Sequence, residues 1–187
     1  VPFTAYGYYL PQDHQSIAST VDVDDQGSYA TIYVYCINTG TSIAGPQCSR
    51  SLDGGHTWDL QLPGSPLTTQ CSGLHAHVVG SIDGWVYRGN PSCEGPAVYA
   101  SDDGGYSWSE HTITTEVGMQ QGWHAHEVAT ATDAVGNVYA MWIGNGMMPW
   151  VSWSTDHGDT WRDPIMVAAP GIEEGGFPTI HAGAEGR

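Results

Sequence analysis

The sequence contains no lysine, and its basic side chains other than histidine are four arginines. Twenty acidic residues give the chain a formal net charge of −16 at pH 7. Nucleic acid is therefore an implausible partner, because almost nothing here could neutralise a run of phosphates. An anionic membrane surface is disfavoured for the same reason.

Long apolar runs are also missing, since no segment approaches the ~20 apolar residues that cross a membrane. No stretch shows sustained helical periodicity, whereas 25 glycines and 11% aromatic residues are typical of strands and turns. The length of 187 residues suits one domain. Because the chain starts at Val1 without an apolar leader, we expect a removed signal or a piece of a longer protein.

The cysteines are few and even in number, and no two have the C-x-x-C spacing of a thiolate zinc site. Disulfides and export to an oxidising compartment fit this pattern better. We therefore predict a secreted or cell-surface protein. The residues concerned are Cys36, Cys48, Cys71 and Cys93.

One phrase, S-x-D-x-G-x-[ST]-W, occurs three times, and its aspartates lie 50 and then 53 residues apart. A period of this size marks one supersecondary unit that is repeated in tandem. In such a phrase Asp can bind the amides of its own turn, Gly can adopt positive φ, and Trp can bury a ring. We therefore predict structural roles for Asp53, Gly55, Trp58, Asp103, Gly105, Trp108, Asp156, Gly158 and Trp161.

Each phrase lies in a unit of four predicted short strands. In the first unit these strands cover 15–21, 31–36, 46–50 and 58–62. In the second they cover 74–82, 85–88, 97–100 and 108–113. In the third they cover 123–132, 138–142 and 150–153, with a fourth strand from Trp161. Four antiparallel strands in ~50 residues is the size of a propeller blade.

The phrase resembles the Asp-box, or bacterial neuraminidase repeat, of sialidase-like β-propellers. The resemblance implies an all-β propeller of four-stranded antiparallel blades in a single domain over 1–187. The blades would cover about 13–66, 74–115 and 123–168, with part of a fourth over 177–187 that starts with a strand at 177–183. Families with this box usually close at six or more blades. We therefore expect an incomplete propeller that missing blades or other chains would close.

In sialidase-like folds the active site lies at the end of the blades opposite the Asp-boxes, and several histidines map there. They are His14, His75, His77, His124, His126 and His181. The words Leu74-His-Ala-His77 and Trp123-His-Ala-His126 are nearly identical, and alternate residues of a strand point to one side.

Three interpretations of these histidines stay open. They could pack between blades, or they could line a glycan pocket with Glu127, Trp123 and Phe177. Alternatively, His75, His77, His124 and His126 could ligate a divalent or transition metal with Glu127. No cofactor is otherwise required.

The blade map also suggests how the cysteines pair. Cys36 ends one predicted strand and Cys48 begins the next, so the two can face each other across a hairpin. Cys71 precedes the next inner strand, and Cys93 lies in a loop of the same blade. We predict bridges 36–48 and 71–93, which would both stiffen loops at this end.

A sialidase needs three arginines for the sugar carboxylate, a Tyr–Glu pair and an acid/base carboxylate. Arg50 and Arg162 flank the repeated phrases and Arg187 is terminal, which leaves Arg88 as the one well-placed candidate. True sialidase activity is therefore not expected from this chain. Weak candidates for acid or base are Glu127, Asp13 and Glu94.

Two functions remain nearly balanced. In the first, an exported propeller binds or processes glycans at its histidine-rich end. In the alternative, a non-catalytic extracellular scaffold, adhesion protein or complex subunit docks another protein. A transition-metal-binding propeller is the third candidate.

Overall fold

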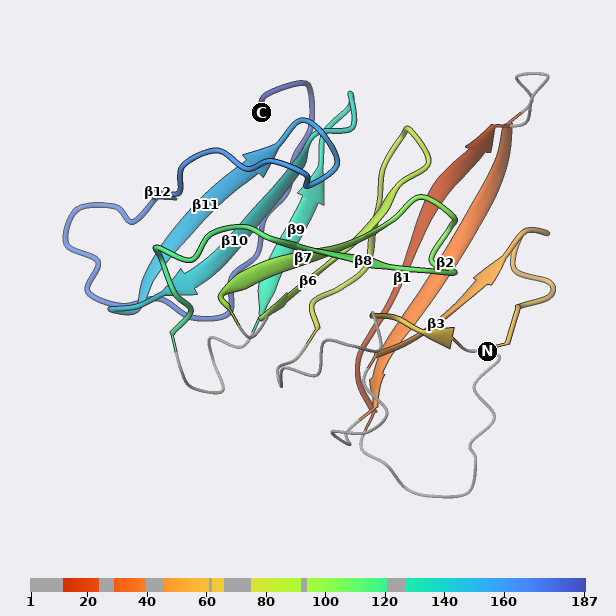
Figure 1. The fold of residues 1–187 in the computed structure, drawn as a ribbon, viewed down its shortest axis with the longest axis horizontal. Coiled ribbons are helices and arrows are strands. Elements are labelled where there is room, and N and C mark those ends of the chain that lie inside the picture. The colour runs from red at the N-terminus through yellow and green to blue at the C-terminus, as the bar shows by residue number, and fades with distance from the viewer. Residues whose placement is uncertain are drawn as a thin grey trace.

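The computed structural model describes residues 12–23, 29–39, 46–60, 62–65, 75–91, 94–120 and 127–187. Within these residues the chain forms three four-stranded sheets, each antiparallel throughout (Figure 1). The first sheet contains β1 (Gln12–Val23), β2 (Tyr29–Thr39), β3 (Pro46–Ser51) and β4 (Leu62–Pro63). The second contains β5 (Val79–Gly80), β6 (Val86–Pro91), β7 (Pro96–Ser101) and β8 (Ser109–Thr112). The third contains β9 (Val128–Thr132), β10 (Val138–Gly144), β11 (Met148–Ser154) and β12 (Ile165–Met166).

The order of strands in each sheet follows the order of the sequence. Consecutive antiparallel strands need only short connections, which the glycine-rich turns supply. The predicted all-β class and four-strand units are therefore present. No closed barrel is formed by the described strands.

Several strands are shorter than their apolar patterns predict. The strand expected over 58–62 is only β4, and the one expected from Trp161 is only β12. Both tryptophans still belong to the preceding turn, because the next residues close it: Asp59 N donates to Arg50 O and Arg162 N to Trp153 O. The regular hydrogen-bond ladder of the sheet starts only after these two turn bonds.

The first strands of the second and third units are also shorter than predicted. The strand expected over 74–82 is only β5, and the described part of the one expected over 123–132 starts at Val128. Residues 177–183, which were predicted as a first strand, form no strand. Where this segment ends, Gly183 O accepts a backbone hydrogen bond from Ala134 N.

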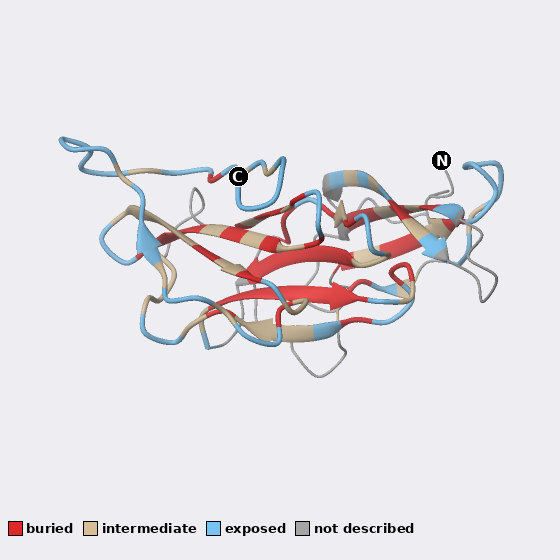
Figure 2. Cartoon of the chain, turned by 90° about the horizontal axis from the view of Figure 1, so that it is seen from above, coloured by how far each residue is buried: buried red, intermediate tan, exposed pale blue. Residues whose placement is uncertain are grey.

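The core lies in two layers, one between each pair of neighbouring sheets. Alternate β2 residues such as Ile32 and Val34 pack with Val86, Tyr99 and Trp108 of the second sheet. The opposite face of that sheet packs against the third sheet through Tyr87, Val98 and Ala100 on one side and Val138, Ala140 and Trp142 on the other. Burial on both faces explains why all six β7 residues are buried (Figure 2).

The first strands of the three sheets approach one another closely. Thr20 Oγ1 donates to Ser81 O at 2.8 Å, and Thr132 Oγ1 donates to Gly80 O at 3.0 Å. Gly80 and Gly89 make these approaches feasible, because a Cβ at either position would collide with backbone of the adjacent sheet. The first strand of each sheet therefore lies on the side where the sheets converge.

The described residues include no helix that is long and apolar enough to cross a membrane.

Candidate functional site

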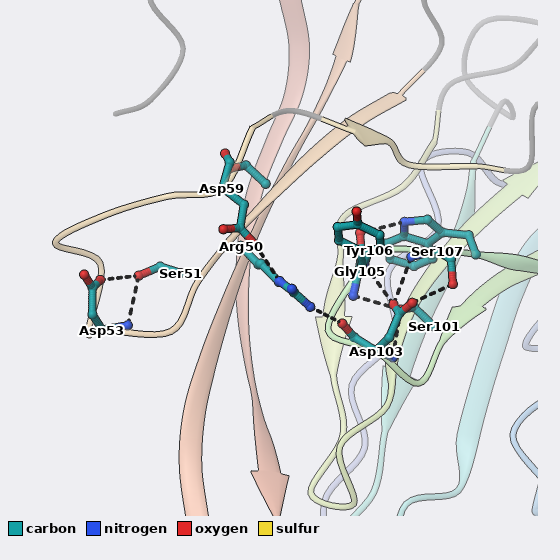
Figure 3. A network of polar contacts seen from close by, with 11 residues as sticks. Arg50, Ser51, Asp53, Asp59, Ser101, Asp103, Gly105, Tyr106 and Ser107 are labelled. Carbon is teal, nitrogen blue, oxygen red and sulfur yellow. Dashed lines mark hydrogen bonds and ion pairs between the residues drawn. The ribbon is translucent and has the colours of Figure 1, made fainter.

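The three repeated phrases form turns of one design, which we call the Asp turns (51–58, 101–108 and 154–161). In the second, Asp103 Oδ1 accepts bonds from the backbone N of Tyr106 and Ser107, both at 2.9 Å, and from Ser101 Oγ at 2.7 Å (Figure 3). Ser107 Oγ donates to Asp103 Oδ2 at 2.6 Å, and Gly105 N donates to Ser101 Oγ at 2.8 Å. The carboxylate is thus occupied by its own turn.

The other two turns repeat these contacts. Thr57 N donates to Asp53 Oδ1 at 2.8 Å, and Thr160 N donates to Asp156 Oδ1 at 2.9 Å. Hydrogen bonds from Thr57 hold the pKa of Asp53 at about 2, and bonds from Thr160 and Ser154 do the same for Asp156. Acceptors that are already saturated and ionised suit turn stabilisation rather than proton transfer.

The pKa values of Asp103 and Asp133 are also lowered, although burial of these two carboxyls opposes the shift. Burial raises the pKa of each carboxyl, but hydrogen bonds outweigh it. For Asp133, donors on Asn137, Gly186, Val135 and Tyr139 lower the pKa to about 2. The β9–β10 turn is therefore also held together by a carboxylate.

One Asp turn also joins two sheets. Arg50 on β3 pairs with Asp59 Oδ2 at 2.6 Å and donates through Nη1 to Asp103 O at 2.7 Å (Figure 3). Its guanidinium lies 5.0 Å from the ring centroid of Tyr106. Arg50 therefore connects the first sheet to the second.

The end of the sheets opposite the Asp turns, which we call the far end, is where the sequence placed the functional residues. It comprises the end of β6, the start of β9 and the β10–β11 connection (Figure 1). Among the described residues it carries Glu94, Glu127, Asn145 and Phe177, and the Phe177 side chain is 61% exposed. Gly175 N donates to Met147 O, which brings the segment before Phe177 to the β10–β11 connection.

Arg88, the arginine that seemed best placed for a ligand, is fully buried between the first and second sheets. Its Nη1 lies 3.7 Å from Cys48 Sγ, and a Cβ at Gly64 would come within 2.7 Å of the same nitrogen. Burial lowers the pKa of this guanidinium to about 9. Arg88 is therefore shielded from any ligand that arrives from solvent.

His75 and His77 have different environments. His75 is only 6% exposed and stacks on Tyr99 with ring centroids 5.3 Å apart, whereas His77 is exposed. Burial, reinforced by the charge of Arg88, holds the pKa of His75 well below its usual range. Residues 75–78 are not in a strand, so the alternation that predicted two parallel side chains does not apply to them.

Tyr99 extends this buried polar cluster in a way that the sequence did not reveal. Its hydroxyl accepts from Asn90 Nδ2 at 3.1 Å and donates to Glu110 Oε2 at 3.4 Å. These residues come from β6, β7 and β8. No spacing rule in one sequence pairs such positions, although the alternation of β6 could have placed Arg88 and Asn90 on one face.

The remaining predicted residues are placed as follows. Glu127 is half-buried before β9, while Glu94 and His181 are exposed. The segment with Trp123, His124 and His126, together with Cys71, Cys93 and the side chains of Asp13 and His14, lies outside the described residues. Within the described part of the chain, no three His, Cys, Asp or Glu side chains are grouped to hold a metal ion.

The predicted bridge between Cys36 and Cys48 is confirmed. The two residues are direct partners on β2 and β3, their Cα atoms are 4.2 Å apart, and both side chains are buried. The bridge ties the hairpin where it packs on the second sheet.

No protein-family model and no curated protein sequence matches this chain. Among solved structures it is similar to a protein of unknown function from Dyadobacter fermentans, at 14% identity and TM-score 0.46, over 79% of this chain and 50% of that one. It is also similar to the intramolecular trans-sialidase from Ruminococcus gnavus, at 16% identity and TM-score 0.44, over 65% and 26%. The NanB sialidase from Streptococcus pneumoniae gives 14% identity and TM-score 0.47, over 86% and 26%. The chain thus spans a quarter to a half of the lengths of these proteins.

Proposed function

We propose that this chain forms three neighbouring blades of a sialidase-like β-propeller that binds or processes glycans at the far end. The observation that carries the proposal is a difference between the polar residues at the two ends of the sheets. At one end, the carboxylates of all three Asp turns are saturated by their own turns. The far end carries the carboxylates of Glu94 and Glu127 and the exposed aromatic side chain of Phe177.

Glycans are recognised by aromatic faces together with polar groups that fix orientation. Phe177 offers an exposed ring, and Glu127 and Glu94 offer carboxylates at the far end. A pair of carboxylates is also what glycoside hydrolysis requires. Glu127 is therefore our candidate acid or base, with Glu94 or Asp13 as the second carboxylate.

The arginines argue against sialic acid as the ligand. Arg88 is buried, Arg50 joins two sheets, and Arg162 and Arg187 are exposed away from the far end. A clamp for the sugar carboxylate would need several guanidinium groups at one point. We therefore propose glycans other than sialosides for these blades.

The alternative function is a non-catalytic extracellular scaffold that docks another protein. The burial of Arg88 and His75 favours it, because it leaves these two side chains packing between sheets as residues of a scaffold would. The Cys36–Cys48 bridge fits export, and we propose a secreted or cell-surface location for either function. Further blades or partner chains would complete the ring.

Metal binding at His75, His77, His124 and His126 is the third proposal. Metal analysis of purified protein with His75 and His124 changed together tests it. A metal content that is absent, or equal in the two proteins, contradicts it.

A glycan array and a panel of glycosides test the leading proposal. We expect binding or turnover that falls at least about tenfold in Glu127→Gln, since a group that acts on the ligand is worth this much or more. The matched control is Asp102→Asn, an exposed acid in an Asp turn, which should behave like the wild type. No binding and no turnover with any glycan contradict the glycan function and leave the scaffold.

A further inference from the structure

The joints between neighbouring sheets repeat one arrangement. We call the face of a sheet that packs on the preceding sheet its leading face, and the face that packs on the following sheet its trailing face. Val34 of the first trailing face packs with Val86 of the second leading face. Tyr87 of the second trailing face packs with Val138 of the third leading face. Each joint therefore unites one trailing face with one leading face.

Each joint also packs an Asp turn onto the preceding sheet. The second turn approaches the first sheet so closely that a Cβ at Gly105 would lie 2.9 Å from Val34 Cγ1. In the third turn His157, which keeps a left-handed backbone with φ of 62°, stacks on Trp85 of the second sheet with centroids 4.3 Å apart. An Asp turn is therefore part of the surface by which one sheet meets another.

The first Asp turn has no preceding sheet among the described residues. Gly55 is exposed and Trp58 is half-buried. Gly105 and Trp108, at the same positions of the second turn, are both buried. A Cβ at Gly55 would meet only Trp58 of its own turn among the described side chains. The first turn thus keeps the exposure that the other two lose in a joint.

The strands of the first leading face are exposed as well. Ala18 pairs with Val34 of the trailing face, so its neighbour Ile17 points to the leading face. Ile17 is 59% exposed, and Tyr33 on the same face is half-buried. The strand residues 15–21 and 31–37 include no charged side chain. This face is therefore an uncharged surface that ends in an exposed Asp turn.

The trailing face of the third sheet is also uncovered by the strands that the structure describes, since they supply no fourth sheet. Val138 and Ala140 of β10 face the second sheet, so the residues that alternate with them face away from it. With partners on the neighbouring strands, the outward residues include Ala129, Tyr139, Met141, Val151, Trp153 and Ile165. None of these side chains carries a charge, and Ile165 is 50% exposed.

Ile165 holds the place that His111 has in the second sheet. Each pairs with the residue three positions before the serine that opens the Asp turn, which is Val151 for Ile165 and Val98 for His111. His111 lies against the following Asp turn, because a Cβ at Gly158 would be 3.2 Å from its Cγ. Ile165 is therefore the residue that would meet the Asp turn of a sheet packed on the third.

We propose that a second copy of this chain covers these faces, with the leading face of the first sheet of one copy docked on the trailing face of the third sheet of the other. One chain carries both faces of such a joint, and the same joint forms twice within it. Because the strands of both faces lack charge, two copies of net charge −16 can meet there without like charges in contact. The inference rests on the blade arrangement of the proposed function, but not on glycan binding.

A joint between unlike faces leaves one further face open on each copy, so docking continues until the assembly closes on itself. The first strands converge on one side of the sheets, where Thr20 and Thr132 both donate to the second sheet. Successive sheets are therefore arranged around an axis, which favours a closed ring. Two copies form the smallest ring in which every face is covered.

The mass of the purified chain in solution, measured by sedimentation over a range of concentrations, tests the docking. We expect twice the mass of one chain. Ile17→Glu and Ile165→Glu should each raise the dissociation constant at least about tenfold, because each would bury an unpaired carboxylate in the joint. The matched control is Ile82→Glu, since Ile82 is 61% exposed but belongs to the second sheet, whose two faces are already covered. All three isoleucines are at least half exposed in the single chain, so folding should be preserved.

Mixing the two variants identifies which faces meet. The Ile17→Glu copy keeps its trailing face and the Ile165→Glu copy keeps its leading face, so the mixture should regain one intact joint. We expect a 1:1 complex at a concentration where each variant alone is a monomer. A monomeric wild type, a mixture without a complex, or variants that associate as well as Ile82→Glu would overturn the proposal. Glycan binding by a monomeric wild type would overturn the docking alone and leave the proposed function standing.

Discussion

Single aspartate carboxylates hold the three repeated turns of this protein together. Asp53, Asp103 and Asp156 each gather side-chain and backbone donors from within five residues. Bonds to a charged acceptor are stronger than bonds between neutral groups, and they last only while the carboxylate stays ionised. The turns should therefore weaken in acid.

We predict that the stability supplied by Asp156 is lost between about pH 4 and about pH 2. Its pKa in the folded protein, about 2, lies below the ordinary aspartate value, so the unfolded chain takes up the proton first as the pH falls. The contribution is therefore complete above about pH 4 and absent below about pH 2. Urea unfolding of the wild type and Asp156→Asn across this range measures it.

At about pH 6 the Asn variant should be less stable by about 1 kcal/mol, the order of one hydrogen bond. The difference should shrink as the pH approaches 2. Asp102→Asn serves as the control, because Asp102 is an exposed acid within the second Asp turn. A difference of constant size at all pH values would contradict the assignment.

At the scale of elements, the second and third Asp turns each pack onto the sheet that precedes them. A Cβ at Gly105 would lie 2.9 Å from Val34 Cγ1, and Trp108 is buried between the first and second sheets. The corresponding contacts of the third turn are made by His157 and Gly158. Each of these turns therefore closes a hairpin and also sets the distance between two neighbouring sheets.

We predict that Gly105→Ala destabilises the protein by at least about 1 kcal/mol more than Gly171→Ala does. Both glycines have positive φ, 85° and 88°, so both variants incur a similar backbone cost. Gly171 has open space where the methyl would go, whereas Gly105 meets a stiff valine. Thermal unfolding of the two variants checks this prediction. Equal losses of stability would mean that Val34 can move aside to make room for the methyl group.

The repeat predicted the central strands well and the flanking ones poorly. Strands such as β2, β3, β7 and β10 follow alternating or apolar runs between glycine turns, and local pattern defines them. The limits of β4, β5 and β12 depend on where a neighbouring strand can still pair. Trp58 and Trp161 have strand-like residue types, yet turn hydrogen bonds hold the residues that follow them.

At the scale of the whole molecule, the sequence placed its candidate site residues at one end of the blades, but it did not reveal which of them reach solvent. Arg88, His75 and His77 looked alike as polar residues near strand ends. Arg88 is buried against Cys48 of the first sheet, 40 residues away in the sequence, and His75 packs on Tyr99 of β7. A single sequence holds no signal of such long-range packing, whereas His157 could have been noticed by aligning the three turns.

We predict that the Cys36–Cys48 bridge contributes about 2–4 kcal/mol to the stability of the whole chain. Urea unfolding of the wild type and of Cys36→Ala with Cys48→Ala should show this gap without reductant. With reductant the gap should close, and any effect of the other two cysteines cancels because both proteins carry them. A gap that persists in reductant would show that packing of the buried sulfurs, rather than the bond, supplies the stability.

The second sheet lies between the other two and has no broad face in water (Figure 2). Energetic coupling in this molecule is therefore one-dimensional, with each sheet sensing its nearest neighbour alone. Among the described strands, none of the first sheet packs extensively on one of the third, so a perturbation of the first sheet reaches the third through the second. The amides of β6 and β7 should accordingly open last, and their opening should report the cooperative unfolding of all three sheets.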